Sequence, residues 1–415
     1  MTTLVCLVSD QHIPNLLTIK VIRPDHLVLV VTNRMKKNVP WFLQALITGG
    51  MDYSPDNRHS ILEIARENSV EETALSLKSA YARDPNKEWI LNITGGTKPM
   101  STGAYMFALE NRLKALYIVE SDQYHAIDLT GGEPISLDGQ HVTATEFLAG
   151  YGYDIRNVGE LERQNQLAAE LQGLGALITE HHESRNLRQF LGKLQNLKER
   201  KKAESKRAYD REGLILSAEE HLWISNGEVR RQICSMFNLR ENGRALVGRL
   251  DRTAVEFLTG RWLEYFVFGL LSPLVPAAIR CLQVGLTTGR AGPGESNEFD
   301  VSFMTERSLC MVECKTGSQK HDARGDSVLY KIEAIKAGLR ALRVGAVLAT
   351  TSPNIIDRNT NEIRQALVNR CRMYGFTIIS GKTLKELAVR YRQKDPLLND
   401  RVADLFLPGR SPGIR

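Results

Sequence analysis

The chain has 415 residues and a formal net charge of +6, with 42% hydrophobic and 25% charged residues. These values are ordinary for a soluble globular protein and allow two or three domains with their own cores. They exclude a membrane-embedded protein, because no uninterrupted apolar stretch approaches the length that a spanning helix needs.

Six scattered cysteines without a C-x-x-C pair argue against both a disulfide framework and a zinc finger. They suit a reducing cytoplasm. The first residues, MTTLVCLVSD, lack a basic leader and a cleavage site, so they are predicted to form a strand rather than a signal peptide. We therefore expect a cytoplasmic protein.

Residues 1 to about 130 alternate short apolar runs with helical patterns. The predicted strands cover 3–10, 26–33, 88–96 and 115–121, and the predicted helices cover 12–22, 37–48, 69–84 and 98–112. Strands that are apolar almost throughout, alternating with helices, indicate a parallel sheet covered on both faces. We predict a doubly wound, Rossmann-like α/β domain, which would bind its ligand beyond the carboxyl ends of the strands.

The stretch NITGGTKPMS, residues 92–101, joins one of these strands to a helix. It is not an ATPase loop, because G-x-x-x-x-G-K-[ST] places four residues between its glycines and here Gly95 and Gly96 are adjacent. Adjacent glycines still let backbone N–H groups approach a phosphate, and Thr97 and Lys98 can meet it at the helix start. The alternative is a simple tight turn.

The region from about 155 to 245 shows no convincing strand and two long helical patterns, 162–178 and 185–212. Residues 185–211 hold ten Lys or Arg against three acidic residues. This basic segment could contact nucleic acid, or it could be a solvated or dimer-forming helix.

From about 250 the pattern becomes helix, three strands, helix, strand, helix, strand. The two best-defined helices cover 252–274 and 327–342, and the strands cover 278–286, 297–305, 308–317, 344–351 and 376–380.

The strands NEFDVSF and CMVECKTG carry the most specific chemistry of the chain. Because strand side chains alternate faces, Glu298 and Asp300 share one face of the first, and Glu313 and Lys315 share one face of the second. If the two strands pair as a hairpin, Asp300 and Glu313 converge on a divalent cation, Mg²⁺ or Mn²⁺, with Lys315 beside them. Such a set suits phosphodiester hydrolysis.

Three further residues could extend this centre. Glu264, on the preceding helix, could supply another carboxylate, and Lys331 and Glu333, on the following helix, could line the cleft. The alternative is that these acids and the lysine face solvent on an exposed hairpin, which would show the same spacing. The apolar flanks favour the metal-dependent nuclease, because they would not tolerate a buried Glu–Lys pair unless it were paired or metal-bound.

Together these motifs resemble two known families. EFD followed by VECKTG, with WLE upstream, resembles the PD-(D/E)-x-K restriction-endonuclease-like nucleases, although Phe299 stands where the motif has proline. NITGGTKPMS resembles CRISPR-associated Rossmann-fold (CARF) sensor domains. The combination is similar to the CRISPR ancillary nucleases of type III systems, which take part in antiviral defence.

The resemblance implies a role for each matching residue. It assigns Asp300, Glu313 and Lys315 to the nuclease centre, with Glu264 and Glu298 as supporting acids and Asp300, Glu313 and Glu264 as the metal ligands. It assigns the cyclic-oligoadenylate pocket to residues of two loops, Ser9, Asp10, Gln11, Thr94, Gly95, Gly96, Thr97 and Lys98.

The resemblance also implies a domain order and an activity. Residues 1–150 would be the CARF domain, 151–245 a helical linker or dimerisation region, and 246–415 the nuclease domain. Cyclic tetra-adenylate, bound across a homodimer, would activate cleavage of single-stranded DNA or RNA with low sequence specificity. The messenger's ring size and the choice between DNA and RNA are left open.

Two other functions share some of these features. A restriction or repair endonuclease would need no messenger, and a nucleotide-sensing regulator would have no catalysis. A dinucleotide-dependent oxidoreductase is excluded, because no G-x-G-x-x-G follows the first strand.

Overall fold

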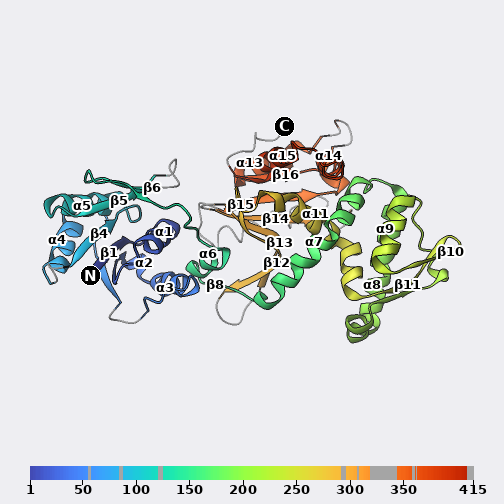
Figure 1. Ribbon diagram of the computed structural model, residues 1–415, viewed down its shortest axis with the longest axis horizontal. Helices are drawn as coiled ribbons and strands as arrows, with labels where there is room; N and C mark the ends of the chain where they lie inside the picture. The colour runs from blue at the N-terminus through green and yellow to red at the C-terminus, as the bar shows by residue number, and fades with distance from the viewer. Residues whose placement is uncertain are drawn as a thin grey trace.

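The structure is a computed structural model, and it describes residues 1–54, 58–83, 87–119, 125–290, 296–305, 308–317, 344–357, 360 and 362–408. The helix predicted over 327–342, with Lys331 and Glu333, lies outside these described residues. In the described part, an N-terminal α/β domain, a central α/β domain and a smaller unit follow one another along the long axis (Figure 1).

The N-terminal domain is built on a seven-stranded sheet of order β3-β2-β1-β4-β5-β6-β7. The five strands from β3 to β5 are parallel, and β6 and β7 continue the sheet antiparallel. The strands are β1 (Thr2–Leu7), β2 (His26–Thr32), β3 (His59–Ile64), β4 (Glu88–Asn92), β5 (Lys114–Ile118), β6 (His125–Asp128) and β7 (Ile135–Ser136).

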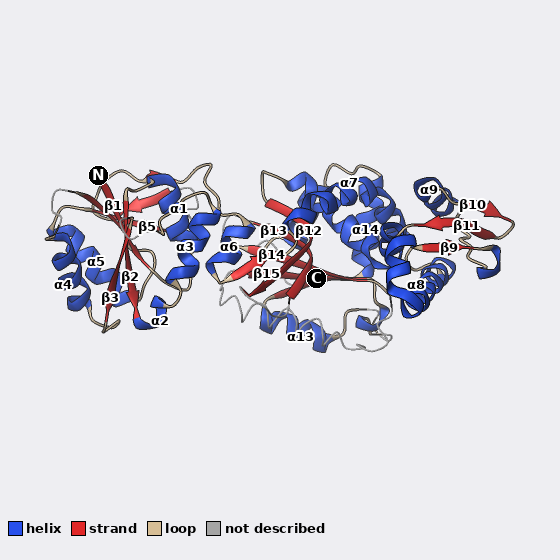
Figure 2. Ribbon diagram, turned by 90° about the horizontal axis from the view of Figure 1, so that it is seen from below, coloured by secondary structure: helices blue, strands red, loops and turns tan. Residues whose placement is uncertain are grey.

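Helices cover both faces of this sheet (Figure 2). They are α1 (Ile13–Ile22), α2 (Asn33–Lys36), α3 (Val39–Thr48), α4 (Val70–Tyr81), α5 (Lys98–Glu110) and α6 (Ala144–Gly150). Helices α1 and α3 share one buried cluster with the sheet, and α4 and α5 share another on the opposite face. The sequence-based prediction of a doubly wound α/β domain is therefore confirmed.

The central domain has a six-stranded mixed sheet of order β16-β15-β14-β13-β12-β8. Its strands are β8 (Tyr153–Ile155), β12 (Arg280–Arg290), β13 (Ser296–Met304), β14 (Leu309–Lys315), β15 (Val344–Thr350) and β16 (Phe376–Ile379). The edge strand β8 follows α6 directly and pairs antiparallel with β12. The link from the N-terminal domain is thus part of the second sheet.

The helices of this domain cover the two faces of its sheet. They are α7 (Val158–Glu180), α10 (Arg252–Glu256), the π-helical turn η2 (Phe257–Arg261), α11 (Trp262–Leu271), η3 (Ser272–Leu274), η4 (Pro353–Ile355), α13 (Gln365–Tyr374), α14 (Gly381–Arg392) and α15 (Leu398–Phe406). Helices α7, α11, α14 and α15 share a buried cluster with one face of the sheet, and α13 packs on the other. That second cluster continues through α6 into the N-terminal domain.

The smaller unit corrects one sequence-based expectation. The long helix α8 (Arg185–Glu212) occupies the predicted range, although non-helical backbone at Ser205 divides it into two segments. The expectation of no strand between 155 and 245 is wrong. A three-stranded sheet of order β10-β11-β9 packs here with α9. Its elements are β9 (Leu214–Leu216), η1 (Ala218–Glu220), α9 (Gly227–Phe237), β10 (Arg240–Asn242) and β11 (Ala245–Leu250). None of the described helices is long and apolar enough to cross a membrane.

Candidate nuclease centre and candidate ligand site

The hairpin of β13 and β14 places Asp300 opposite Glu313. The antiparallel register pairs Val301 with Val312, so Asp300 and Glu313 follow as the next opposed position. On β14, Cys310, Val312 and Cys314 face the cluster under α11, and Glu313 and Lys315 therefore project to the other side. The structure thus brings together the two carboxylates and the lysine of the motif.

Lys315 binds both carboxylates. Its Nζ lies 2.5 Å from Oε1 of Glu313 and 3.9 Å from Oδ2 of Asp300. Oδ2 of Asp300 also accepts a hydrogen bond from the backbone N–H of Cys314, at 2.7 Å. The Glu313 side chain is only 6% exposed, so its charge requires such a partner.

The same pairing fixes the protonation state of the lysine. Burial by itself lowers the pKa of the Lys315 ammonium, but the charges of Asp300 and Glu313 outweigh burial and raise the pKa above its usual value. Lys315 is therefore a cation at neutral pH. It can stabilise developing negative charge on a phosphate, and it is poorly suited to act as a base.

Glu264 brings a third carboxylate to the centre from the first turn of α11. Burial raises its pKa well above the usual value, and the negative charges of Asp300 and Glu298 raise it further, while Arg261 and Lys315 oppose them. Glu264 therefore belongs to the same electrostatic group as the hairpin acids.

Glu298 lies at the margin of this group, with 47% of its side chain exposed. Arg261, which sequence reasoning missed, donates from Nη2 to Oε1 of Glu298 at 3.2 Å, and its Nε lies 4.0 Å from Oε2 of Glu264. The sequence offered one signal for it: an arginine three residues before Glu264 at a helix start, where the two side chains meet.

Gln164, on α7, was also missed. Its Oε1 is buried without a hydrogen-bond donor. A Cβ built at Gly285, on the neighbouring strand β12, would lie 2.2 Å from this oxygen and 3.5 Å from Oε1 of Glu298. A side chain at this position would displace the Gln164 amide, and the φ of +66° also favours glycine. No sequence pattern pointed to this contact.

The donor set fits a hard divalent cation such as Mg²⁺ or Mn²⁺. Among the described residues, no group of three or more histidine, cysteine, aspartate or glutamate side chains is already arranged to hold a metal ion. Asp300 nevertheless interacts electrostatically with Glu264 and shares Lys315 with Glu313, and the orphaned oxygen of Gln164 lies beside Glu298. A carboxylate whose pKa is raised by neighbouring negative charge, as that of Glu264 is, also favours a bound cation.

A second candidate site lies at the carboxyl edge of the N-terminal sheet, between β1 and β4. These adjacent strands lead to helices on opposite faces, α1 and α5, so the strand order reverses here. Ligands of doubly wound folds bind at such a switch point. The two loops of the sequence-based prediction, residues 9–11 and 94–98, follow these two strands.

The two loops touch each other. A Cβ built at Gly95 would lie 2.1 Å from the backbone oxygen of Leu7 and 3.2 Å from Oγ of Ser9, so only glycine fits. Ser9 in turn accepts a hydrogen bond from the N–H of Gln11, at 3.3 Å. The loop after β4 thus packs directly on the loop after β1.

The start of α5 presents an anion-binding end to this edge. Gly96 adopts a φ of +76°, and Thr97 caps the helix by accepting from the N–H of Met100 at 3.4 Å. Lys98 is the first residue of the helix and is exposed. Thr94 is oriented by hydrogen bonds to Oδ1 of Asn92, at 2.7 Å from its hydroxyl. The helix dipole and the charge of Lys98 both favour a phosphate here.

Asp10 connects this edge to the following domain. Its Oδ2 lies 3.0 Å from Nη2 of Arg34, its Oδ1 is buried without a donor, and its backbone oxygen accepts from the hydroxyl of Tyr151 at 2.8 Å. His12, two residues on, is buried among Tyr151, Phe42 and Gly150. Sequence reasoning missed Arg34, His12 and Tyr151.

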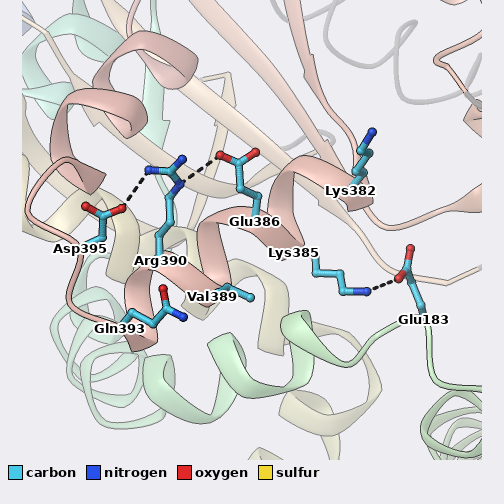
Figure 3. A pocket seen from close by; sticks show the side chains of 8 residues that line it. All are labelled: Glu183, Lys382, Lys385, Glu386, Val389, Arg390, Gln393 and Asp395. Atoms are coloured by element: carbon cyan, nitrogen blue, oxygen red, sulfur yellow. Dashed lines mark hydrogen bonds and ion pairs between the residues drawn. The ribbon is translucent and has the colours of Figure 1, made fainter.

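One hollow in the described part is distinct from both sites. It has a volume of about 770 Å³ and lies along α14 (Figure 3). Lys385 pairs there with Glu183, and Arg390 pairs with Glu386 and Asp395. Because most of its charges already neutralise one another, this hollow offers no obvious site for a charged ligand.

The basic segment of α8 is partly directed inward. Lys198 is 8% exposed and, with Lys202, binds Glu256 at the end of α10. Lys206 and Arg207 remain exposed on the same helix. Only part of this segment is therefore available to a polyanion.

Two family models match the sequence, one in each large domain. Residues 3–136 match the Card1 CARF domain, and residues 251–382 match the Card1-like endonuclease domain. No curated protein matches the sequence.

Two solved structures share the fold over nearly the whole chain. Can2 from Sulfobacillus thermosulfidooxidans, in complex with cyclic tetra-adenylate, has a TM-score of 0.65 and 20% identity, covering 95% of this chain and 99% of its own. Protein VC1899 from Vibrio cholerae has a TM-score of 0.72 and 17% identity, covering 96% and 98%. The arrangement of both domains is thus a known one.

Proposed function

We propose that this chain, in which a Card1 CARF domain is joined to a Card1-like endonuclease domain, is a divalent-metal-dependent endonuclease activated by a cyclic oligoadenylate. One observation carries the proposal: Lys315 lies within 2.5 Å of Glu313 and 3.9 Å of Asp300 in the endonuclease domain. The start of α5, with Lys98 as its first residue, lies at the switch point of the CARF sheet in the same chain and supports a phosphate site there.

The chemistry of the nuclease centre follows from its residues. A divalent cation, when bound, polarises the scissile phosphate and lowers the pKa of a bound water. Asp300, Glu313 and Glu264 would hold that cation through their carboxylates. Lys315, which lies 2.5 Å from Glu313 and 3.9 Å from Asp300, would stabilise the negative charge that develops on the phosphate.

For the messenger we propose cyclic tetra-adenylate, the ligand named for Can2. Ser9, Asp10, Gln11 and the loop from Thr94 to Lys98 would bind it. The start of α5 in one chain would hold one phosphate, and a ring with repeating phosphates can be held by two identical chains. We therefore propose a homodimer with the messenger on its two-fold axis.

The substrate that we propose is single-stranded DNA, RNA or both, with little sequence preference. The nuclease centre uses carboxylates and a lysine that act on a phosphodiester and read no base. The physiological role would be antiviral defence in a type III CRISPR system.

One panel of reactions tests the proposal. Labelled single-stranded DNA, single-stranded RNA and duplex DNA are incubated with Mg²⁺, Mn²⁺ or EDTA, and with cyclic tri-, tetra- or hexa-adenylate or none. We expect cleavage of a single strand only with a divalent ion and cyclic tetra-adenylate. The Glu313→Gln protein, prepared in parallel, controls for a contaminating nuclease.

The other outcomes point to the other functions. Equal cleavage without any oligoadenylate would indicate a messenger-independent restriction or repair endonuclease. Binding of an oligoadenylate without cleavage of any substrate would indicate a nucleotide-sensing regulator.

A further inference from the structure

The helix before the nuclease hairpin is interrupted at one place. The sequence predicts one continuous helix over 252–274, but residues Phe257–Arg261 form a π turn between α10 and α11. Within it, Gly260 departs from helical geometry, with φ 175° and ψ −46°. A π turn adds a residue and so rotates the helix that follows, and such turns are frequent at functional sites.

A buried polar network holds the start of this turn. Glu256, the last residue of α10, accepts hydrogen bonds from Nζ of Lys198 at 2.5 Å, Nζ of Lys202 at 3.2 Å and the hydroxyl of Tyr209 at 2.9 Å. Lys198 also donates to Oγ1 of Thr259, inside the turn, at 3.0 Å. Helix α8 therefore holds the end of α10 and the first residues of the π turn in place.

The end of the turn carries Arg261. Its guanidinium lies between two carboxylates from different elements, Glu298 of β13 at 3.2 Å and Glu264 of α11 at 4.0 Å. The arginine side chain is 30% exposed. In the continuous helix that the sequence predicts, Arg261 would point in another direction, because the extra residue of a π turn changes the rotation by about 100°.

We propose that Arg261 is a positioning residue of the nuclease centre, which holds Glu264 and Glu298 in fixed orientations and balances their charge. This inference rests on the proposed nuclease function. The π turn, anchored by the Lys198–Glu256 contact, aims the guanidinium at both acids.

An arginine suits this role better than a lysine. The planar guanidinium presents several N–H donors in a fixed geometry and can bind two carboxylates in different directions at once. An ammonium is a point charge, so it can neutralise the acids but orients them poorly. The variant Arg261→Lys therefore keeps the positive charge but loses the fixed geometry that orients the two acids.

The test compares Arg261→Gln, Arg261→Lys and the control Arg390→Gln. Arg390, on α14, is a matched control because it is 36% exposed and also binds two carboxylates, Glu386 at 3.1 Å and Asp395 at 2.9 Å (Figure 3). For each full-length protein, kcat and KM are measured with activator and Mn²⁺. Mn²⁺ affinity is measured separately by calorimetry.

We expect Arg261→Gln to change the two readouts in opposite directions. Its kcat should fall at least about tenfold, because Glu264 and Glu298 lose their orientation, while KM for nucleic acid stays within about twofold. Mn²⁺ should bind at least about threefold more tightly, because a nearby positive charge has been removed. A misfolded protein would instead show both a lower kcat and a lower Mn²⁺ affinity.

The two other variants complete the expected pattern. Arg261→Lys keeps the charge, so its Mn²⁺ affinity should match the wild-type value while its kcat lies between wild type and Arg261→Gln. Arg390→Gln should leave kcat and Mn²⁺ affinity unchanged.

Several results would overturn the inference. An unchanged kcat in Arg261→Gln would remove Arg261 from the centre, and a raised KM at constant kcat would make it a substrate-binding residue instead. Weaker Mn²⁺ binding, or full rescue of kcat by lysine, would contradict the positioning role. If wild-type protein cleaves nothing, the proposed function fails, and the Mn²⁺ measurements still decide whether Arg261 opposes the charge of these acids.

Discussion

The hydroxyl of Tyr151 donates a hydrogen bond to the backbone carbonyl of Asp10, at 2.8 Å. Asp10 lies in the loop after β1, at the candidate messenger site. Tyr151 ends α6, two residues before the edge strand β8, which pairs with β12 of the nuclease sheet. One side chain therefore links the messenger loop to the segment that enters the nuclease sheet.

Removing this hydroxyl should uncouple the two domains. In Tyr151→Phe, we expect messenger affinity to stay within about twofold while the stimulation of cleavage by the messenger falls about fivefold, the value of one hydrogen bond of about 1 kcal/mol. Stimulation is measured as the ratio of cleavage rates with and without cyclic tetra-adenylate, and affinity by calorimetry.

Tyr105→Phe is the matched control. Its hydroxyl also donates to a backbone carbonyl of the CARF domain, that of Leu129 at 3.2 Å, but in an exposed position away from α6. Stimulation that falls equally in both variants would indicate a general weakening of the domain. Unchanged stimulation in Tyr151→Phe would show that this hydrogen bond does not couple messenger binding to cleavage.

Loss of the charge at Lys98 should weaken messenger binding. We expect about a tenfold lower affinity for Lys98→Gln, together with a smaller dependence of affinity on salt, because a charge-assisted contact to phosphate is lost. Lys114→Gln provides the control, because Lys114 is equally exposed but begins β5 at the opposite edge of the sheet. Equal affinity and salt dependence in the two variants would exclude Lys98 from the site.

Loss of one acid of the hairpin should abolish cleavage and spare sensing. For Glu313→Gln we expect cleavage to fall at least about a hundredfold, since a metal-binding carboxylate is lost. The fold should survive, because Lys315 retains Asp300 at 3.9 Å. Messenger affinity, measured on the same preparation, should equal that of wild type.

The control for this variant is Glu241→Gln, which removes an exposed carboxylate paired with Arg230 at 2.9 Å. If Glu313→Gln cleaves as fast as this control, the assignment of Glu313 to the nuclease centre is wrong.

The sequence predicted those parts of the fold in which local pattern and burial coincide. Strand β1 begins with two threonines and is apolar from Leu4 to Leu7, which are completely buried, so the apolar run identified it correctly. On β14, the alternation of Cys310, Val312 and Cys314 with Glu313 and Lys315 gave the correct faces. In both strands, the residues that form the pattern are neighbours in the sequence.

Other elements depend on contacts that no local pattern contains. Strand β3 was not predicted, because it lies at the sheet edge and of its residues only Ile64 is fully buried. Strands β8, β9 and β10 have three residues each, too few for periodicity to show. Strands β8 and β9 pair with strands far along the chain, and β10 forms a hairpin with the next strand, β11. The π turn was not predicted for a similar reason, because the helical repeat of apolar residues does not show where one residue is inserted.

The candidate sites divide in the same way. Asp300, Glu313 and Lys315 lie within one hairpin, so their spacing alone indicates their meeting. Arg34, Tyr151 and Gln164 reach the two sites from elements far along the chain, and only the tertiary fold brings them there.

The burial of His12 predicts a loss of stability in mild acid. Burial lowers the pKa of His12 to about 4 from its usual 6.5, and the charge of Asp10 and a hydrogen bond to Gly150 offset only part of this effect. Above pH 6.5 both the folded and the unfolded state hold a neutral imidazole. Between these two pKa values the unfolded state binds a proton that the folded state excludes, so the free energy of unfolding falls as the pH falls.

The expected loss is about 3 kcal/mol over this range, at about 1.4 kcal/mol for each pH unit. His12→Phe retains a ring against Phe42 and Tyr151 and cannot titrate. Denaturant unfolding at pH 7 and pH 4.5 should therefore show a smaller loss for the variant than for wild type. Equal losses would mean that His12 does not titrate on unfolding.

The network at Glu256 predicts a stability effect that a surface pair should not show. Glu256→Gln leaves the ammonium of Lys198, 8% exposed, without its anionic partner. Removing one member of a buried pair costs about 3 kcal/mol, so we expect a loss of about 2–4 kcal/mol in the free energy of unfolding. Glu220→Gln, which breaks the exposed pair with Arg200, should cost less than about 1 kcal/mol.

The pH dependence of the same pair gives an independent check. Burial raises the pKa of Glu256, but hydrogen bonds and charges from Lys198, Tyr209 and Lys202 outweigh it and lower the pKa below its usual 4.5. The stabilisation is therefore complete above pH 4.5 and is lost as the pH falls through the folded pKa. The difference in unfolding free energy between wild type and Glu256→Gln should shrink below that pH. A difference that stays constant down to pH 3 would show that the carboxylate charge is not what holds Lys198.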